Sequence, residues 1–164
     1  MMTSVVLLLG SNDHAASVIV DRAVTILGAS VGDIVKVSGE YISAPYGFSH
    51  ANNFINRAVE IATTLNAYEL LRRINLIEAL LGRDREEERR ISAARGEQYA
   101  SRPIDIDIVF YGDETYDDDR LTIPYHYLDI REYALRPVAE VAATRRHPAL
   151  ASTPEEMLKR ISNK

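Results

Sequence analysis

The sequence predicts an α+β fold of the ferredoxin-like type, an antiparallel sheet with helices packed on it. Two observations lead to this prediction. Segments with strand-like and helix-like apolar patterns follow one another in the order β-α-β-β-α-β, and 164 residues without cysteine are enough for one well-buried core. We expect a single domain over residues 1–164, with an added hairpin and C-terminal helices after the first six elements.

The first strand and helix follow from an apolar run and a capping signal. Residues 4–9 form a short apolar run that ends at a glycine, which is typical of a buried strand. Asn12 or Asp13 would then cap a helix that runs to about Leu27 and ends at Gly28.

Two more strands and a second helix complete the middle of the chain. Residues 34–43 are rich in Val and Ile, and residues 54–62 alternate, so each segment predicts a strand. Residues 66–69 carry a capping box. Apolar residues at helical spacing over residues 70–81 predict the helix that follows, which ends at Gly82.

The pattern then changes. Residues 83–102 have few apolar side chains and no clear period, so they predict a long, mobile connection, and loops of this length are often functional. Residues 104–110 alternate as a strand does. The acidic, turn-rich residues 112–119 then predict a hairpin that leads to residues 121–123.

Two helices are predicted near the C-terminus. Residues 131–141 have a helical period, with Pro137 either in the first turn or at a kink. Residues 153–156 read Thr-Pro-Glu-Glu, a helix start with a threonine cap and proline at the first position.

Composition and charge exclude several classes of protein. The absence of cysteine excludes a disulfide scaffold, a cysteine-ligated metal site and a thiol nucleophile. The net charge of −5 argues against non-specific binding to nucleic acid or to an anionic membrane. No apolar stretch approaches a membrane span, and the N-terminus lacks the pattern of a signal peptide. We therefore expect a cytoplasmic monomer that acts on small molecules, with no nucleic-acid or membrane partner.

The basic residues are distributed unevenly. Of 19 basic side chains 16 are arginine, and eight arginines lie between Arg72 and Arg102. Arginine suits planar, bidentate recognition of phosphate or carboxylate. A solvated helix face with its following loop is the alternative, because acidic residues lie among these arginines. They are Asp84, Glu86, Glu87, Glu88 and Glu97.

Two aspartates share one face of a predicted strand. Asp105 and Asp107 alternate with isoleucines at 104, 106 and 108, so the isoleucines face the core and the carboxylates face the other side, roughly 7 Å apart. Two like charges on one face repel, and a divalent cation with oxygen ligands would offset the repulsion. The alternative is a wet sheet face on which the aspartates pair with Arg102.

A carboxylate pair directly after an arginine-rich segment is suited to polyphosphate chemistry. Magnesium bridges phosphate oxygens, and arginines neutralise the charge of the transition state. The sequence contains neither a P-loop motif nor the glycine-rich loop and strand lysine of protein kinases. Gly10-Ser11-Asn12 is too short to indicate a dinucleotide site.

Several short motifs occur in a characteristic order. They are Gly10-Ser11-Asn12, Tyr41, Ser43-Ala44-Pro45-Tyr46-Gly47, Phe54-Ile55-Asn56, Glu78, Gly82-Arg83-Asp84-Arg85, Arg102, Ile104-Asp105-Ile106-Asp107-Ile108, Leu121-Thr122-Ile123-Pro124 and Arg131. In this order the chain resembles the 6-hydroxymethyl-7,8-dihydropterin pyrophosphokinase family over roughly residues 5–148. The most specific part is Gly-Arg-x-Arg followed by Arg-x-x-Asp-x-Asp and Ile-Pro.

The resemblance implies an enzyme of folate biosynthesis that transfers pyrophosphate from ATP to the hydroxymethyl group of the pterin, giving AMP and the pterin diphosphate. It implies that Asp105 and Asp107 hold two Mg²⁺ ions, which bind the ATP phosphates and orient the attacking hydroxyl. Four arginines would act on the nucleotide: Arg83 and Arg85 at the start of a mobile loop that closes over it, and Arg102 and Arg131 as phosphate clamps.

The resemblance also assigns residues to the two substrates. Those near the nucleotide are Asn75, Glu78, Ile108 and Thr122. Those at the pterin are Ser43, Ala44, Pro45, Tyr46, Gly47, Phe54, Asn56 and Tyr133. Phe54 and Tyr133 would stack on the ring, and Asn56 would hydrogen-bond to it.

Three features depart from the family's pattern. The family usually has a histidine directly after Ile-Pro, whereas here Tyr125 takes that place and His126 follows, so that either side chain is a candidate for the phosphate. Tyr99 is the aromatic residue nearest to the position where a tryptophan is common, and it would cap the pterin. The loop over residues 86–101 is longer than in familiar members.

The substitution at Tyr125 keeps a second class of function open. This is a homologue that binds nucleotide or pterin without turnover. A third class, a ferredoxin-like module that binds RNA, is disfavoured by the net charge of −5 and by the paired aspartates, which repel phosphate in the absence of metal.

Overall fold

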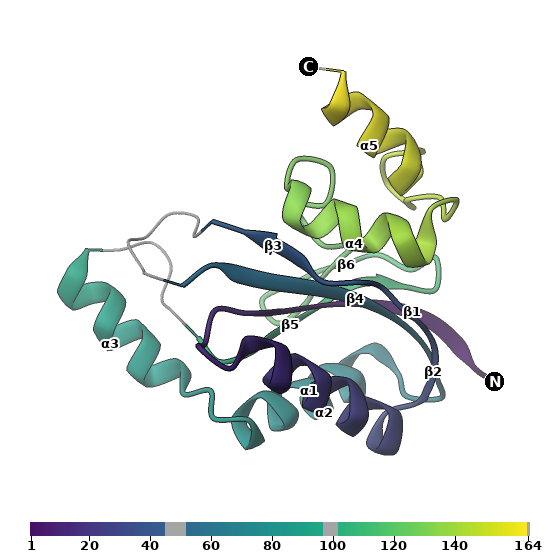
Figure 1. Cartoon of the computed structure of the whole chain (residues 1–164). Helices are drawn as coiled ribbons and strands as arrows, with labels where there is room; N and C mark the ends of the chain where they lie inside the picture. The colour runs from purple at the N-terminus through teal and green to yellow at the C-terminus, as the bar shows by residue number, and fades with distance from the viewer. Residues whose placement is uncertain (45–51, 97–101, 164) are drawn as a thin grey trace.

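The protein is built on an antiparallel sheet with helices on both faces (Figure 1). The computed structural model describes residues 1–44, 52–96 and 102–163. The strands of the sheet are β1 (Thr3–Ser11), β2 (Asp33–Val37), β3 (Tyr41–Ser43), β4 (Phe54–Thr63) and β5 (Asp105–Tyr111). Their order is β2-β4-β1-β5, and β3 also pairs with β4. This is the order of a ferredoxin-like sheet when β2 and β3 count as one edge strand, so the predicted fold class is confirmed.

The helices form layers on the two faces. They are α1 (Ala16–Ser30), α2 (Ala67–Leu80), α3 (Arg85–Arg95), α4 (Glu132–Ala142) and α5 (Pro154–Ser162). In Figure 1, α1 and α2 lie on one side of the sheet and α4 with α5 on the other. None of the helices in the described part of the chain combines the length and apolar character that a membrane span requires.

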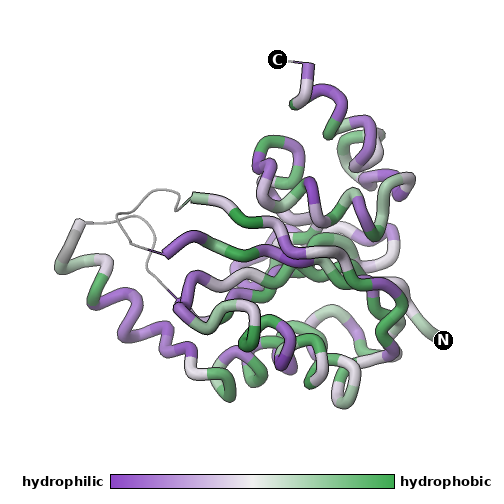
Figure 2. The backbone as a smooth tube through the Cα atoms, viewed as in Figure 1, coloured by the Kyte–Doolittle hydropathy of each residue, from purple (hydrophilic) through white to green (hydrophobic). Residues whose placement is uncertain are grey.

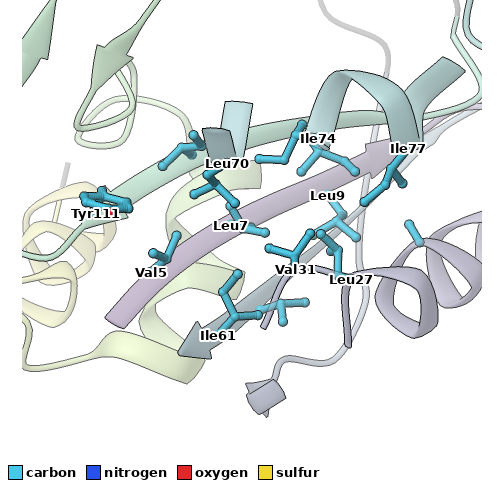
Figure 3. Packing of buried hydrophobic residues seen from close by; sticks show 14 of the residues in the cluster. Val5, Leu7, Leu9, Leu27, Val31, Ile61, Leu70, Ile74, Ile77 and Tyr111 are labelled. Atoms are coloured by element: carbon cyan, nitrogen blue, oxygen red, sulfur yellow. The ribbon is translucent and has the colours of Figure 1, made fainter. Parts of the chain in front are cut away.

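The central strand β1 contributes to the apolar cores on both faces. Val5, Leu7 and Leu9 pack among residues of α1 and α2 (Figure 3). Val6 and Leu8 belong to the second core, with residues of α4 and α5. Because successive side chains of a strand point to opposite faces, one apolar run supplies both cores.

The first helix differs from its prediction at both ends. Asp13 does not begin the helix, because its Oδ1 accepts the N–H of Ala15 at 2.9 Å in a turn that precedes α1. Gly28 does not end it either, because α1 continues to Ser30. A Cβ at Gly28 would lie 3.1 Å from Cγ1 of Ile34, so this glycine permits close packing of the helix on β2.

The strand predicted over residues 34–43 is divided in two. Residues 38–40 interrupt it, because the Ser38 Oγ accepts the N–H of Ala58 at 2.8 Å in place of a backbone carbonyl. Both pieces, β2 and β3, still pair with β4.

The prediction of a mobile connection over residues 83–102 is wrong for its central part, which is the helix α3. The Asp84 side chain caps α3 by accepting the N–H groups of Glu86 and Glu87 at 3.1 Å. Gly96 ends it in the left-handed conformation, with φ of 68°. Figure 2 shows α3 as largely hydrophilic. Its caps and the acidic first turn stabilise this helix in place of a buried apolar stripe.

The remaining elements follow their predictions with small differences. The hairpin pairs β6 (Tyr116–Asp117) with β7 (Thr122–Ile123), as a separate two-stranded sheet. Pro137 was predicted either in the first turn of its helix or at a kink. It lies in the second turn of α4. The predicted cap of α5 is present at Thr153.

Replacing Thr153 with alanine is expected to lower stability by about 1 kcal/mol, the usual value of an N-cap. The Thr153 Oγ1 accepts the N–H of Glu156 at 3.3 Å, and the Glu156 Oε1 accepts the N–H of Thr153 at 3.1 Å. Urea unfolding measures the change, and Thr153→Ser, which keeps the acceptor, is the control. An alanine variant as stable as the serine variant would contradict the capping role.

Candidate active site

A cleft of about 460 Å³ lies over one end of the sheet, on the face that β1 turns toward α4. Most of the residues predicted to form the site line it. They are Ser43, Ala44, Phe54, Asn56, Asn75, Arg83, Arg85, Arg102, Asp105, Asp107, Ile108, Thr122, Tyr125, His126 and Tyr133. Ser43 and Tyr133, 90 positions apart in the sequence, therefore meet at one cavity.

Two of the predicted residues that the structure describes, Arg131 and Glu78, do not line the cleft. Pro45, Tyr46, Gly47 and Tyr99 lie outside the described residues. Arg131 precedes the first turn of α4, where its guanidinium lies 5.0 Å from the centre of the Tyr127 ring. Glu78 is 1% exposed and lies beneath the cleft wall.

Sequence reasoning missed seven residues of the lining: Leu8, Gly10, Leu71, Ile106, Arg120, Leu121 and Tyr127. Leu8 and Gly10 could have been found from the sequence, because alternate residues of β1 share one face of the strand. Arg120 carries no such signal, because its place depends on how the hairpin folds back beside the sheet. Its guanidinium lies 5.3 Å from the centre of the Tyr68 ring.

The register of three neighbouring strands sets the floor of the cleft. Gly10 of β1 pairs with Asn56 on β4 and with Asp105 on β5. Two residues earlier, Leu8 pairs with Asp107 on β5. The amide and the two carboxylates therefore project from the same face of the sheet.

The two aspartates form a strained pair of like charges. Burial raises the pKa of Asp107 well above its ordinary value, and the charges of Asp105 and Glu78 raise it further. Asp105 is compensated, because its Oδ1 accepts from Arg83 at 2.8 Å and its Oδ2 lies 3.6 Å from Arg102. Of the two carboxylates, Asp107 is therefore the one whose negative charge is disfavoured in the folded protein.

Two carboxylates are suited to a magnesium ion that also binds phosphate. Mg²⁺ usually keeps several waters and takes one or two carboxylates together with substrate phosphates. Within residues 1–44, 52–96 and 102–163, no cluster of three or more ligating side chains is present. The donor set fits an ion shared with a polyphosphate and does not fit a closed structural site.

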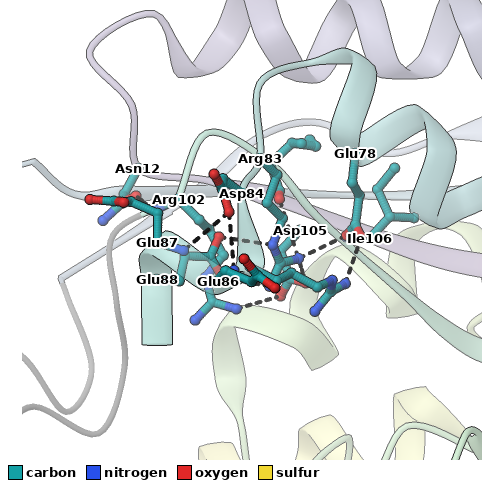
Figure 4. A network of polar contacts seen from close by, with 12 residues as sticks. Asn12, Glu78, Arg83, Asp84, Glu86, Glu87, Glu88, Arg102, Asp105 and Ile106 are labelled. Atoms are coloured by element: carbon teal, nitrogen blue, oxygen red, sulfur yellow. Dashed lines mark hydrogen bonds and ion pairs between the residues drawn. The ribbon is translucent and has the colours of Figure 1, made fainter. Parts of the chain in front are cut away.

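A buried ion-pair network supports the arginine wall of the cleft (Figure 4). The Arg83 side chain is 4% exposed and bonds to Glu78 at 2.9 Å and to Glu88 at 3.0 Å, in addition to Asp105. Glu78 also accepts from Arg85 at 2.7 Å and from the N–H of Ile106 at 2.8 Å. Burial raises the pKa of Glu78, and the charge of Arg83 opposes that shift.

Both carboxylate oxygens of Glu78 therefore accept hydrogen bonds from other groups of the protein. It ties α2 to β5 through Ile106 and orients two arginines. Its sequence position contained this signal, because an acidic residue falls within the apolar stripe of α2, between Ile77 and Leu81.

Tyr125 lies on the cleft wall with its hydroxyl 3.1 Å from that of Tyr133. Its backbone N–H donates to the carbonyl of Val109 at 3.1 Å, which fixes this segment on β5. Burial and the charge of Asp107 raise the pKa of Tyr125, so the phenol stays neutral. His126 also lines the cleft but is exposed.

The cleft thus joins two chemical environments. One end has arginines and carboxylates suited to metal-bound phosphate, and the other has Asn56 and aromatic rings suited to a flat heterocycle. A group transferred between a polyphosphate and such a ring would meet both sets of residues.

Comparisons with known proteins identify the family of the chain. A family model described as 7,8-dihydro-6-hydroxymethylpterin-pyrophosphokinase (HPPK) matches residues 6–143. The chain is 35% identical over 142 residues to the 2-amino-4-hydroxy-6-hydroxymethyldihydropteridine pyrophosphokinase of Methylorubrum extorquens, covering 86% of this chain and 84% of that protein. It is 33% identical over 134 residues to the enzyme of the same name from Bacillus subtilis, covering 81% and 74%.

Solved structures show the same fold. The wild-type HPPK-DHPS of Plasmodium falciparum superposes with a TM-score of 0.76 at 16% identity. The match covers 99% of this chain and 42% of that one, so this chain spans less than half of the larger protein.

Proposed function

The chain belongs to the 7,8-dihydro-6-hydroxymethylpterin-pyrophosphokinase family, and from that premise we propose that it transfers pyrophosphate from ATP to the hydroxymethyl group of 6-hydroxymethyl-7,8-dihydropterin, giving AMP and the pterin diphosphate for folate biosynthesis. The observation that carries the proposal is the single cleft in which the Asp105–Asp107 pair, the arginines and Asn56 meet.

The residues at the phosphate end supply charge. Arg85 and Arg102 line the cleft and would bind phosphate oxygens, where charge spreads as the phosphoryl group is transferred. Asp105 and Asp107 would hold the Mg²⁺ ions, which neutralise phosphate charge and orient the attacking hydroxyl when bound. Arg83 is buried in its ion pairs, so it would act mainly by placing Asp105.

The residues at the other end would hold the pterin. Phe54 and Tyr133 line the cleft on strand and helix and would stack against the ring, while the Asn56 amide would hydrogen-bond to its edge. This alignment directs the hydroxymethyl group toward the aspartates. The hydroxyl oxygen then bonds to the β-phosphorus and loses its proton to solvent, the bond from that phosphorus to the α,β-bridging oxygen breaks, and AMP leaves with that oxygen.

A direct assay tests the proposal. The purified protein, given ATP, the hydroxymethyl dihydropterin and Mg²⁺, is expected to form AMP and pterin diphosphate in equal amounts, and EDTA should stop the reaction. Binding of both substrates without AMP would instead identify the homologue that binds without turnover.

The phenol of Tyr125 is expected to contribute one neutral hydrogen bond at the phosphate end. Tyr125→Phe should lower kcat about tenfold, the rate equivalent of one hydrogen bond of about 1.4 kcal/mol. The wild-type and Tyr125→Phe enzymes should show the same pH dependence from pH 6 to 8, because the phenol does not ionise there. His126→Phe is the comparison, and a larger loss in that variant would transfer the role to His126.

A further inference from the structure

We propose that Gly10 is a specificity-determining residue of the cleft: because it has no side chain, the Asn56 amide can lie over β1, where it would meet the edge of a flat heterocycle. The inference rests on the proposed function and assigns a role to a glycine that the sequence pattern left without one.

The backbone conformation of Gly10 does not require glycine. It lies within β1 and is absent from the described glycines with positive φ, which are Gly82, Gly96 and Gly112. Glycine inside a strand weakens it, and it commonly marks a place where a ligand or another group comes close. The reason for this glycine is therefore to be sought in the space around it.

That space is taken by one side chain. A Cβ built on Gly10 would lie 2.6 Å from the Asn56 Oδ1 and 3.6 Å from its Cγ. The first distance is well inside van der Waals contact, so Asn56 occupies the room that a side chain would need. The Asn56 conformation seen here is compatible only with glycine at position 10.

Asn56 is itself unusual. It is 5% exposed and lines the cleft. Asparagine is depleted in strands, and β4 places this one at the cleft. An amide placed in this way is suited to a ligand with both a donor and an acceptor on one edge.

The row Asn56–Gly10–Asp105 crosses three adjacent strands. Strands in a sheet are about 4.8 Å apart, so the backbones of Asn56 and Asp105 are about 10 Å apart with the glycine midway. A fused two-ring heterocycle spans most of that distance. With glycine at the midpoint, no side chain of β1 separates the Asn56 amide from the carboxylates, so such a ring would reach both.

We expect a substitution at Gly10 to affect pterin binding and to leave folding unchanged. The atom in the way of a new Cβ is the end of a flexible side chain, so the Asn56 amide can rotate aside while the backbone stays in place. Gly10→Ala is therefore expected to displace the amide and to raise the KM for the pterin at least tenfold. The KM for ATP and the melting temperature should change little.

A double-mutant cycle tests the mechanism. In an Asn56→Ala background, Gly10→Ala should have no further effect on the pterin KM, because the displaced amide is already absent. Gly39→Ala is the matched control, since a Cβ there meets only the Glu140 carboxylate at 3.7 Å and Gly39 lies outside the cleft lining. An unchanged pterin KM in Gly10→Ala, or additive effects in the double variant, would overturn the inference.

Pterin affinity measured directly by fluorescence titration keeps the two proposals apart. Wild-type protein that binds pterin but forms no AMP would refute the proposed reaction. The Gly10 inference would then stand if Gly10→Ala weakens pterin binding tenfold, and it would fall if the affinity is unchanged.

Discussion

Replacing Asp107 with asparagine is expected to abolish pyrophosphate transfer while making the metal-free protein more stable. The loss of turnover should be at least about 10³-fold, because a metal at a transferring phosphoryl group supplies several kcal/mol of transition-state stabilisation. The gain in stability has a separate origin. Burial, Asp105 and Glu78 all raise the pKa of Asp107, so the folded protein disfavours the ionised carboxylate.

The sign of the stability effect follows from linkage. A carboxyl whose pKa is higher in the folded than in the unfolded state binds protons more tightly when folded, so the contribution of Asp107 to wild-type stability falls as the pH rises from the acid range toward neutrality. Asparagine has no charge to lose, and the advantage of the variant should therefore grow with pH. Thermal unfolding in EDTA at pH 5 and pH 7 measures it.

Magnesium with a non-hydrolysable ATP analogue should reverse the order of stability. Ligand that binds only the folded state raises its stability, and the variant lacks one of the two carboxylates that would hold the ion. Asp33→Asn, an exposed aspartate in β2, is the control and should change neither turnover nor the response to magnesium. Wild-type turnover in Asp107→Asn would refute the metal-binding role.

Replacing Arg83 with leucine is expected to lower the stability by about 3–5 kcal/mol, the usual cost of leaving a buried charge without its partner. Arg83 bonds to Glu78, Glu88 and Asp105 with its side chain 4% exposed. For a chain of this length the melting temperature should fall by about 10 °C. Urea unfolding, combined with the thermal midpoint, measures the loss.

A second variant separates the buried pair from the arginine itself. The double variant Glu78→Leu/Arg83→Leu should be destabilised by less than the sum of the single changes, because no buried carboxylate is left uncompensated. Arg90→Leu, which removes the exposed pair with Glu87 on α3, is the control and should cost no more than about 1 kcal/mol. If Arg83→Leu costs as little as Arg90→Leu, the network has no structural role.

The parts of the fold that follow from local pattern could be predicted. The alternating pattern of β5 predicted that Asp105 and Asp107 face away from the isoleucines, because successive side chains of a strand point to opposite faces. The caps of α2 and α5 were predicted for a similar reason, since a capping side chain bonds within three residues of itself. Interactions that span a few residues can be read from one sequence.

The parts that depend on distant partners could not. Helix α3 has no buried apolar stripe, so periodicity gave no sign of it, and only the Asp84 cap and Gly96 held that information. The alignment of Asn56, Gly10 and Asp105 depends on the register of β1 with both of its neighbours. Placing Glu78 beneath the cleft likewise needed the packing of α2 against β5, although its position within an apolar stripe was a usable hint.

The alternating residues of β1 contribute to two apolar cores and to the floor of the cleft. This limits where residues can be inserted into the chain. A one-residue insertion between Val5 and Gly10 would exchange the faces of every later residue of the strand, so that core side chains would enter the cleft and Gly10 would turn away from Asn56. Insertions in the hairpin between Gly112 and Thr122 shift no such alternation. Length differences among related sequences should accordingly accumulate in the hairpin and be absent from β1.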